Sequence, residues 1–341
     1  MSSNIFIIHS CCIPVKGHRR SIIYDLNRNQ YFYITNDLYD ILVSFNGTSK
    51  KVVYKNFDSI NYSLLDDYFK FLEGNEIIFY TKKDNEKLFP RLKVEWESPS
   101  IITNAIIDIT QEIESDNFIL VLSQLESLQC EAIQIREVGN GISSVHLKRL
   151  LDIISKSTIT YVELFLHYRH QDDIEELSRI ANVHNRIFNI YIYNSPKYSI
   201  ESFKSRPYGN VLYIKDNLKN SGKIHDESMF FVNILLFNES HFFNNYYNRK
   251  IYIDENGNIK NSPEVDAIFG NIKQTLILDV IKDKKFNYLW DIKKDDIIIC
   301  CNCEYRYMCV DSRIPKKDEL KNIWFCENKC KYDPYICQWS K

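Results

Sequence analysis

The residues with the clearest chemistry in this sequence are cysteines crowded near its end. Seven of the ten lie between residues 300 and 337: Cys300, Cys301, Cys303, Cys309, Cys326, Cys330 and Cys337. The opening apolar run, Ile5–Ile8, is too short for a secretory signal, so we expect a cytoplasmic protein. In a reducing compartment, clustered thiols bind metal more often than they form disulfides.

The spacing of these cysteines favours metal ligation. Cys300-x-x-Cys303 places two thiolates on one turn, Cys309 follows six residues later, and later cysteines can complete the set. Four soft ligands suit zinc or an iron–sulfur cluster. A zinc ribbon normally has a second Cys-x-x-Cys pair, and none follows here. The other interpretation is that the thiols pack as small apolar groups.

The run Cys300-x-x-Cys303-Glu-Tyr-Arg-Tyr-Met-Cys309, with Cys330-Lys-Tyr-Asp-Pro-Tyr-Ile-Cys337-x-Trp339 after it, resembles the SPASM domain of peptide maturases that accompany ATP-grasp ligases. Such domains extend radical SAM enzymes and usually hold two auxiliary [4Fe-4S] clusters. The resemblance implies one cluster, held by Cys300, Cys303, Cys309 and Cys330, with zinc as the alternative metal. Cys326 and Cys337 are the alternatives to Cys330 as fourth ligand.

The positions expected for the second cluster carry no cysteine. Ser262 and Thr275 flank Gly270, and Ser312 and Arg313 come after Cys309. The resemblance therefore implies that one of the family's two metal sites is kept and the other is lost.

The first ninety residues alternate in a way that predicts short strands followed by helices. Strands are expected at 5–8, 21–26 and 30–34, with a further strand at 75–81. The first expected helix is capped by Thr35 or Asn36 and ended by Gly47, and two more are expected at 49–56 and 63–73. Ser63 and Asp66 have the spacing of a capping box. This order resembles the winged-helix-like recognition element that binds the leader of a ribosomally made peptide. The segments Ile13–Gly17 and Thr35–Ile41 also resemble the opening of the same ATP-grasp-partner family.

A peptide could bind this unit at a sheet edge. The strand at 30–34 can leave unpaired N–H and C=O groups beside the helix at 63–73, and such an edge accepts an extended peptide by β-augmentation. The candidate peptide contacts are Tyr31, Tyr33, Tyr68 and Lys70. Periodicity alone leaves Tyr33 and Tyr68 equally compatible with the core. Cys11 and Cys12, on an apolar strand, are interpreted as packing thiols.

Residues 98–240 alternate between strand and helix patterns, the last expected strand lying at 230–237. Such an order predicts an α/β fold with a parallel sheet, here a partial (β/α) barrel. The pattern resembles a radical SAM core, in which three cysteines follow the first strand. The matching loop, Thr110–Asn117, has no cysteine. We therefore expect no binding or cleavage of S-adenosylmethionine. The strand ends instead present Arg136, Glu137, His167, Arg169 and His170, which could form a polar site.

Composition excludes other classes of function. The 341 residues have a net charge of -2 and are 45% hydrophobic, which is typical of a folded protein of two or three domains. Neither a basic footprint for nucleic acid nor an apolar run long enough to span a membrane is present. The expected units are residues 1–90, 98–240 and 241–341.

The function implied by the resemblance is that of an accessory maturation protein. It would bind the precursor of a graspetide-like peptide and cooperate with an ATP-grasp ligase, without radical SAM chemistry of its own. The alternative is a redox or hydrolytic peptide-modifying enzyme that uses the C-terminal cluster or the His167/His170 loop.

Overall fold

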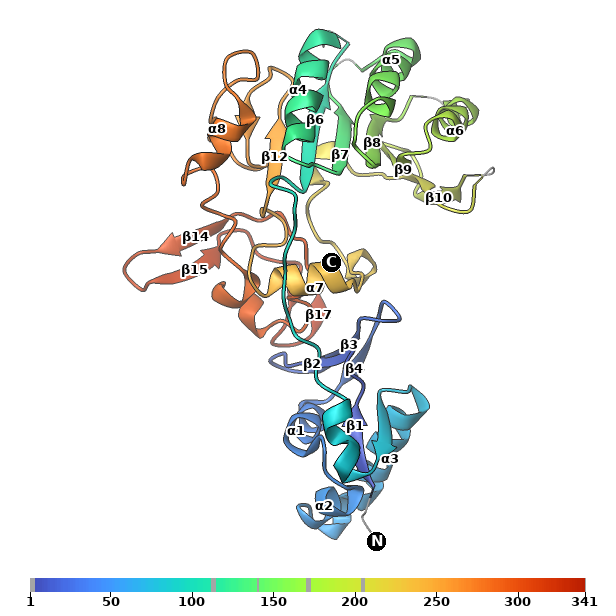
Figure 1. The fold of residues 1–341 in the computed structure, drawn as a ribbon, viewed down its shortest axis with the longest axis vertical. Helices are drawn as coiled ribbons and strands as arrows, with labels where there is room; N and C mark the ends of the chain where they lie inside the picture. Colours follow the sequence, from blue (N-terminus) through green and yellow to red (C-terminus); the bar gives the residue numbers. More distant parts are fainter. Residues whose placement is uncertain (1–3, 112–114, 140, 170–172, 204–205, 341) are drawn as a thin grey trace.

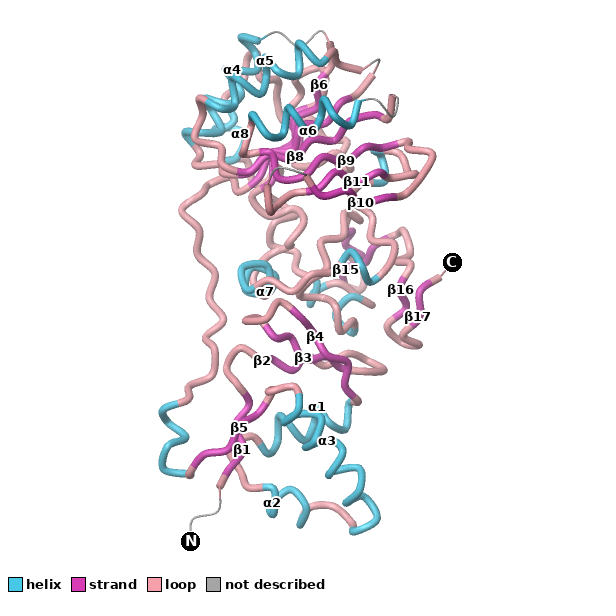
Figure 2. Tube along the Cα trace, turned by 90° about the vertical axis from the view of Figure 1, so that its right-hand side faces the viewer, coloured by secondary structure: helices cyan, strands magenta, loops and turns pink. Residues whose placement is uncertain are grey.

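The computed structural model describes residues 4–111, 115–139, 141–169, 173–203 and 206–340. Three units follow one another along the longest axis of the molecule (Figures 1 and 2). The N-terminal unit lies at one end, a large sheet lies at the other, and the cysteine-rich C-terminal unit lies between them. The linker after residue 90 passes beside the C-terminal unit to reach the sheet, and the chain then returns to the middle.

The N-terminal unit contains the four predicted strands, a fifth, and three helices. β2 (Cys12–Val15), β3 (Ser21–Asp25) and β4 (Gln30–Ile34) form an antiparallel sheet, and β1 (Ile5–Ile8) pairs separately with β5 (Ile78–Thr81). The helices are α1 (Asn36–Phe45), α2 (Lys50–Lys55) and α3 (Tyr62–Gly74). β2 is the strand that the sequence did not predict. β4 pairs with β3 alone, so it is an edge strand as predicted. Whether the unit binds peptides as a winged helix stays a prediction.

The capping box at Ser63 is wrong. A 3-10 turn, Ser59–Asn61, leads directly into α3, and Asn61 occupies the N-cap position. Ser63 therefore lies inside the first helical turn, where the Asp66 side chain accepts a hydrogen bond from Tyr54 instead of closing the helix end. The prediction of a long helix here is nevertheless confirmed, because Leu65, Phe69 and Leu72 are buried at helical spacing.

The large sheet has eight strands in the order β10-β11-β9-β8-β7-β6-β12-β13. Six are parallel: β6 (Asn104–Ile109), β7 (Ala132–Glu137), β8 (Tyr161–His167), β9 (Ile187–Tyr193), β11 (Asn210–Tyr213) and β12 (Lys250–Ile253). The antiparallel edges are β10 (Ser199–Ser202) and β13 (Ile259–Lys260). The connecting helices are α4 (Ser115–Ser127), α5 (Ser144–Ser155) and α6 (Asp173–Val183).

Alternate residues of each strand explain the two faces of this sheet. Ile107 and Ile135 join α4, α5, α6 and α8 (Ile277–Lys282) in one buried apolar core. The alternate positions Asp108, Arg136 and Tyr252 lie on the opposite face and interact with one another. The strand–helix order and the large parallel sheet confirm the α/β prediction.

Two details differ from the sequence prediction. Residues 230–237 are not a strand, because Asn233 accepts hydrogen bonds from the backbone N–H groups of Leu235 (2.8 Å) and Leu236 (3.1 Å) and so starts α7 (Ile234–Ser240). In addition β12, β13 and α8, which the sequence analysis assigned to the third unit, belong to the sheet unit, since β12 pairs with β6.

The C-terminal unit has little regular structure. Its elements are the 3-10 turns η5 (Lys294–Asp296) and η6 (Cys300–Asn302), and the two-stranded ladders β14 (Pro315–Asp318) with β15 (Ile323–Cys326) and β16 (Tyr332–Asp333) with β17 (Gln338–Trp339). An aromatic core that includes Tyr305, Tyr332 and Phe237 also takes in Ile22 and Tyr24 of β3. The three-stranded sheet is thus covered on both faces, by its own helices and by this unit.

None of the described helices is both long enough and apolar enough to cross a membrane.

Candidate metal centre

The four cysteines that the sequence analysis proposed as ligands line one small cavity of the C-terminal unit. Cys300, Cys303, Cys309 and Cys330 contribute to its wall, together with three cationic side chains and the ring of Tyr332. The remaining cysteines of the cluster, Cys301, Cys326 and Cys337, are not part of that wall. The structure therefore brings together the predicted set, from three separate parts of the C-terminal segment.

The turn at η6 aims the first two thiols. The backbone N–H of Cys303 donates to the carbonyl of Cys300 (2.9 Å), which closes the turn between them. Ile299, just before η6, has φ = 71°, a conformation that β-branched residues rarely adopt. Ile299 also lines the cavity. A strained residue at this point costs on the order of 1–3 kcal/mol, and such strain concentrates at functional sites.

Three cations face the cavity: Lys294, Arg306 and Arg313. Buried Asp311 holds two of them, since its carboxylate lies 3.7 Å from the Lys294 Nζ and accepts from the Arg313 Nε (2.6 Å). The Arg313 Nη2 also lies 3.9 Å from the Cys300 sulfur. Four thiolates carry four negative charges, and burying such charge requires nearby compensation. The three cations that line the cavity supply this compensating charge.

Without a metal, burial favours the protonated form of three of these thiols, Cys303, Cys309 and Cys330. Burial raises the pKa of Cys309 to about 12, with Lys294 opposing the shift. Burial also raises the pKa of Cys330, against the effect of Arg313, and that of Cys303 well above its ordinary value. For Lys294, burial alone would lower the pKa, but Asp311 and Cys309 raise it. Metal binding at this site would release protons from the thiols.

The spacing of the sulfurs bears on which group fits. No three of the four sulfurs lie within 4.8 Å of one another. Tetrahedral zinc, with Zn–S bonds of about 2.3 Å, would place its sulfurs about 3.8 Å apart. A four-iron cluster separates its thiolates further, because its irons and sulfides lie between them. The donor set and the spacing fit a cluster with less rearrangement than they fit zinc.

The two alternative fourth ligands have other contacts. The Cys326 sulfur lies 3.9 Å from the carbonyl oxygen of Arg313, and burial raises the pKa of this thiol to about 11. The Cys337 sulfur lies 3.8 Å from the carbonyl of Pro334. Cys330 differs from both because it lines the cavity itself, and its sulfur accepts from the backbone N–H of Tyr332 (3.4 Å).

Three of the four positions expected for a second cluster carry the small polar residues Ser262, Thr275 and Ser312, and the fourth is Arg313. Thr275 faces Gly270, where an added Cβ would lie 2.7 Å from the threonine Oγ1. The buried Ser312 carbonyl accepts from the Tyr247 hydroxyl (2.5 Å). These interactions fill the region with ordinary packing and hydrogen bonds.

Another group of potential metal-ligand atoms lies closer together, in the N-terminal unit. Ligand atoms of Cys11, Cys12 and Asp25 lie within 4.8 Å of one another. The Asp25 carboxylate is already used, because one oxygen accepts from the backbone N–H groups of Asn27 and Arg28 and the other from the Arg28 guanidinium (3.0 Å). Asp25 therefore closes the β3–β4 turn. Cys12 is part of the apolar core, as the packing interpretation requires.

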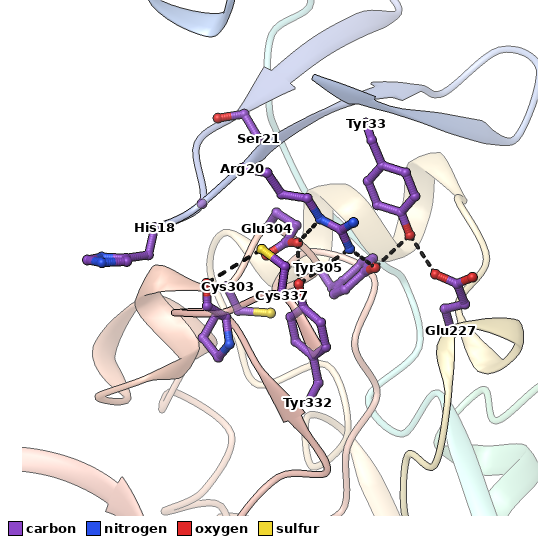
Figure 3. Close-up of polar contacts among 12 residues, drawn as sticks. His18, Arg20, Ser21, Tyr33, Glu227, Cys303, Glu304, Tyr305, Tyr332 and Cys337 are labelled. Carbon is purple, nitrogen blue, oxygen red and sulfur yellow. Dashed lines mark hydrogen bonds and ion pairs between the residues drawn. The ribbon is translucent and has the colours of Figure 1, made fainter. Parts of the chain in front are cut away.

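The N-terminal unit contacts the metal-ligand loop directly. Figure 3 shows Arg20 pointing at Glu304, the residue after Cys303; the Nε–Oε1 distance is 2.7 Å. Glu304 also accepts from the Tyr332 hydroxyl (2.5 Å). Tyr33 shares a hydrogen bond with Tyr305 (2.6 Å). Arg20 before β3 and Tyr33 on β4 therefore form one hydrogen-bonding network with the cysteine loop.

The four predicted peptide contacts lie on different surfaces. Tyr31 and Tyr33 contact each other and both pack against Tyr305. Tyr68, on α3, shares a hydrogen bond with Thr35 (2.8 Å) at the end of β4. Lys70 is exposed on α3. The structure joins the two β4 tyrosines but turns them toward the C-terminal unit, and peptide binding by these residues stays a prediction.

A second polar region lies at the carboxyl edge of the large sheet. Arg136 donates to both oxygens of Asp108 (2.6 and 2.9 Å), and the Tyr252 hydroxyl donates to the same carboxylate (2.7 Å). These residues and His167 line a cavity of about 730 Å³. Glu137 accepts from the backbone N–H of His167 (2.8 Å) and from Arg169. His170 lies outside the described residues, so the His167/His170 pair is untested.

Sequence reasoning missed the cations of the metal site and the Asp108–Tyr252 pair. Lys294, Arg306 and Arg313 belong to no ligand motif, although their closeness in sequence to the cysteines was a usable signal. Asp108 and Tyr252 are 144 residues apart and meet only because β12 pairs with β6. Cys130 is buried and its sulfur lies 3.4 Å from the carbonyl of Ala132, as a packing thiol would.

No family model and no curated protein matches the sequence. Among solved structures, SuiB of Streptococcus suis bound to S-adenosylmethionine is similar with a TM-score of 0.34 and 11% identity, over 89% of this chain and 94% of that one. SuiB bound to its precursor peptide SuiA gives a TM-score of 0.32 and 11% identity over the same shares. Similarity this low supports no conclusion about function, so the proposals below rest on the residues of this chain.

Proposed function

We propose that this chain is an accessory maturation protein for a ribosomally synthesised peptide. Its N-terminal unit binds the precursor, and an ATP-grasp ligase partner forms the bonds. The C-terminal unit carries one [4Fe-4S] cluster on Cys300, Cys303, Cys309 and Cys330. The observation that carries the proposal is the shared cavity of these four thiols, walled by Lys294, Arg306 and Arg313.

The chain's own residues suit a structural role for the cluster. Arg306 donates from Nη1 to the carbonyls of Cys303 (2.9 Å) and Lys16 (2.8 Å), and Arg20 reaches Glu304. These contacts link the ligand loop to the peptide-binding unit. A cluster there would supply cross-linking of a segment with little regular structure and, through its irons, electron transfer.

Two measurements test the proposal. Anaerobic reconstitution followed by iron, sulfide and zinc analysis should give one four-iron cluster per chain with visible absorption. Two clusters per chain would contradict it, and stoichiometric zinc would replace the cluster with the alternative metal. Co-expression with the candidate precursor and ligase should then yield a complex in which the modified peptide appears only when all three are present.

A second candidate function is catalysis by the chain itself. It is favoured by the cavity at the sheet edge, where Asp108, Arg136 and His167 meet. Because the loop from Thr110 to Asn117 carries no cysteine, we expect no 5′-deoxyadenosine from S-adenosylmethionine and reduced protein. Peptide modification by the isolated chain, without the ligase, would favour this candidate and count against the accessory role.

A further inference from the structure

A groove of about 310 Å³ lies on the N-terminal unit, away from the β4 edge. α1 forms one wall, the turn before β2 and β2 itself form the floor, and the linker forms the other wall. Its apolar lining comprises Ile8, Ile13, Pro14, Tyr39, Leu42, Val43, Leu92 and Val94. A volume of this size is in the range of ligand pockets, and it admits side chains of an extended segment.

The linker that forms this wall, residues 91–98, has the side-chain pattern of a β-strand but pairs with no other described strand. From residue 91 to residue 98, exposed and half-buried positions alternate strictly. Leu92 and Val94 pack against the aromatic core of the C-terminal unit, and Trp96 packs on Phe243 with ring centroids 5.1 Å apart. Side chains therefore hold the linker in an extended conformation.

The backbone of this wall is unpaired. Within the part of the chain that the structure describes, no hydrogen bond reaches the N–H or C=O groups of residues 91–97. An extended backbone with free donors and acceptors is the kind of edge to which a peptide adds as a further strand. β2 on the floor is also an edge strand, and its Pro14 has no N–H to offer.

The charge of the groove selects its occupant. Arg91 and His9 line it, and no aspartate or glutamate does. Two neighbouring acidic groups are paired with lysines: Asp40 lies 2.8 Å from the Lys16 Nζ, and Glu95 contacts Lys93. An acidic side chain at the rim would therefore meet Arg91 without a competing carboxylate on the lining.

We propose that this groove is a peptide subsite, separate from the β4 edge, for an extended segment in which apolar and acidic residues alternate. Apolar side chains enter between α1 and the linker, the peptide backbone pairs with residues 91–97, and acidic side chains meet Arg91. The proposal rests on the peptide-binding function proposed above and names the chemistry of the bound segment.

The test uses the full chain and two fluorescein-labelled octapeptides, one alternating valine and glutamate and one alternating valine and lysine, followed by fluorescence anisotropy. The acidic probe should bind and the basic probe should not. Arg91→Glu should lower the affinity for the acidic probe by about tenfold or more and allow the basic probe to bind, as expected for one reversed charge pair. Val43→Glu, at a lining residue that is 49% exposed, should also lower the affinity for the acidic probe, because it adds a negative charge to the groove.

Lys51→Glu, an equal charge change on exposed α2, is the matched control and should leave binding unchanged. Thermal melts should show that all three variants fold as the wild type does. The groove proposal would be overturned if both probes bound equally or if the acidic probe did not bind up to about 1 mM. It would also be overturned if neither Arg91→Glu nor Val43→Glu changed the binding of the acidic probe. Equal loss of binding in Lys51→Glu would also overturn the proposal, because the effect of Arg91→Glu would then reflect net charge and not the groove. Failure of the native precursor to bind at all would count against the proposed function instead.

Discussion

Two groups of cysteines in this chain differ in what surrounds them rather than in how close they lie. The Cys11, Cys12 and Asp25 ligand atoms lie within 4.8 Å, yet the carboxylate is saturated by backbone N–H groups and Arg28. The four C-terminal thiols lie further apart but share a cavity with three cations. Free thiols, space and compensating charge therefore make the C-terminal group, and not the closer N-terminal one, the candidate metal site.

The largest expected effect separates the two groups by removing one thiol from each. Cys309→Ser should lose most of the cluster iron after reconstitution, because one iron then lacks its thiolate in a site built from four cysteines. Cys12→Ser should keep it, since Cys12 packs in the N-terminal core. Iron and sulfide analysis, with far-ultraviolet circular dichroism as the folding check, measures the difference. Equal iron in both variants would remove the distinction between the groups.

The next prediction concerns charge. Arg313→Met removes a cation that lies 3.9 Å from the Cys300 sulfur, so the metal should be lost to a chelator at about 10- to 100-fold lower concentration. Arg28→Met, which removes the partner of Asp25 at the other group, serves as the control and should leave chelator resistance unchanged. A cluster equally resistant in Arg313→Met would mean that the cationic wall is not needed.

A third prediction uses Cys130, a thiol with no metal role. Burial raises its pKa from 9.0 to about 12, so the folded state holds the proton that the unfolded state loses. Its contribution to stability is therefore complete below about pH 9 and is lost as the pH rises toward 12. The unfolding free energy of the wild type should fall in this range more steeply than that of Cys130→Ala, by up to about 1 kcal/mol per pH unit. Identical slopes in urea titrations would refute this.

The smallest expected effect is local strain. Ile299→Asn should stabilise the metal-free protein by about 1 kcal/mol, because asparagine tolerates a positive φ better than a β-branched residue does. Ile298→Asn, at a position of similar exposure without a positive φ, should give no gain. Denaturant midpoints compare the two. A gain in both variants would point to surface polarity instead of strain.

Local patterns predicted most of the elements because the responsible residues are neighbours in sequence. Leu38, Ile41 and Leu42 give α1 its buried face, and the alternating isoleucines of β6 and β7 give the parallel strands. The strand expected at 230–237 failed because one capping side chain, Asn233, outweighed β-forming residues. β2 was missed because it is four residues long and contains Pro14.

The metal site could be predicted in part for the same reason. The spacing from Cys300 to Cys309 is local, and the resemblance supplied Cys330. The cationic wall depends on Asp311 folding back to both Lys294 and Arg313, which spacing does not encode. The facing of Tyr31 and Tyr33 depends on Tyr305, 272 residues beyond Tyr33, so no window of sequence could assign it.

The contact between Arg20 and Glu304 also sets an order of events during synthesis. The two residues are 284 positions apart, whereas the core of the N-terminal unit closes entirely among residues 6–78. At about 5–20 residues per second, a ribosome needs roughly 15–60 s to make the intervening chain. The N-terminal unit can therefore complete its own core early, yet the face bearing Arg20 and Tyr33 stays uncovered on the nascent chain until the last cysteines emerge. For that interval it is accessible to chaperones or to the precursor peptide proposed above.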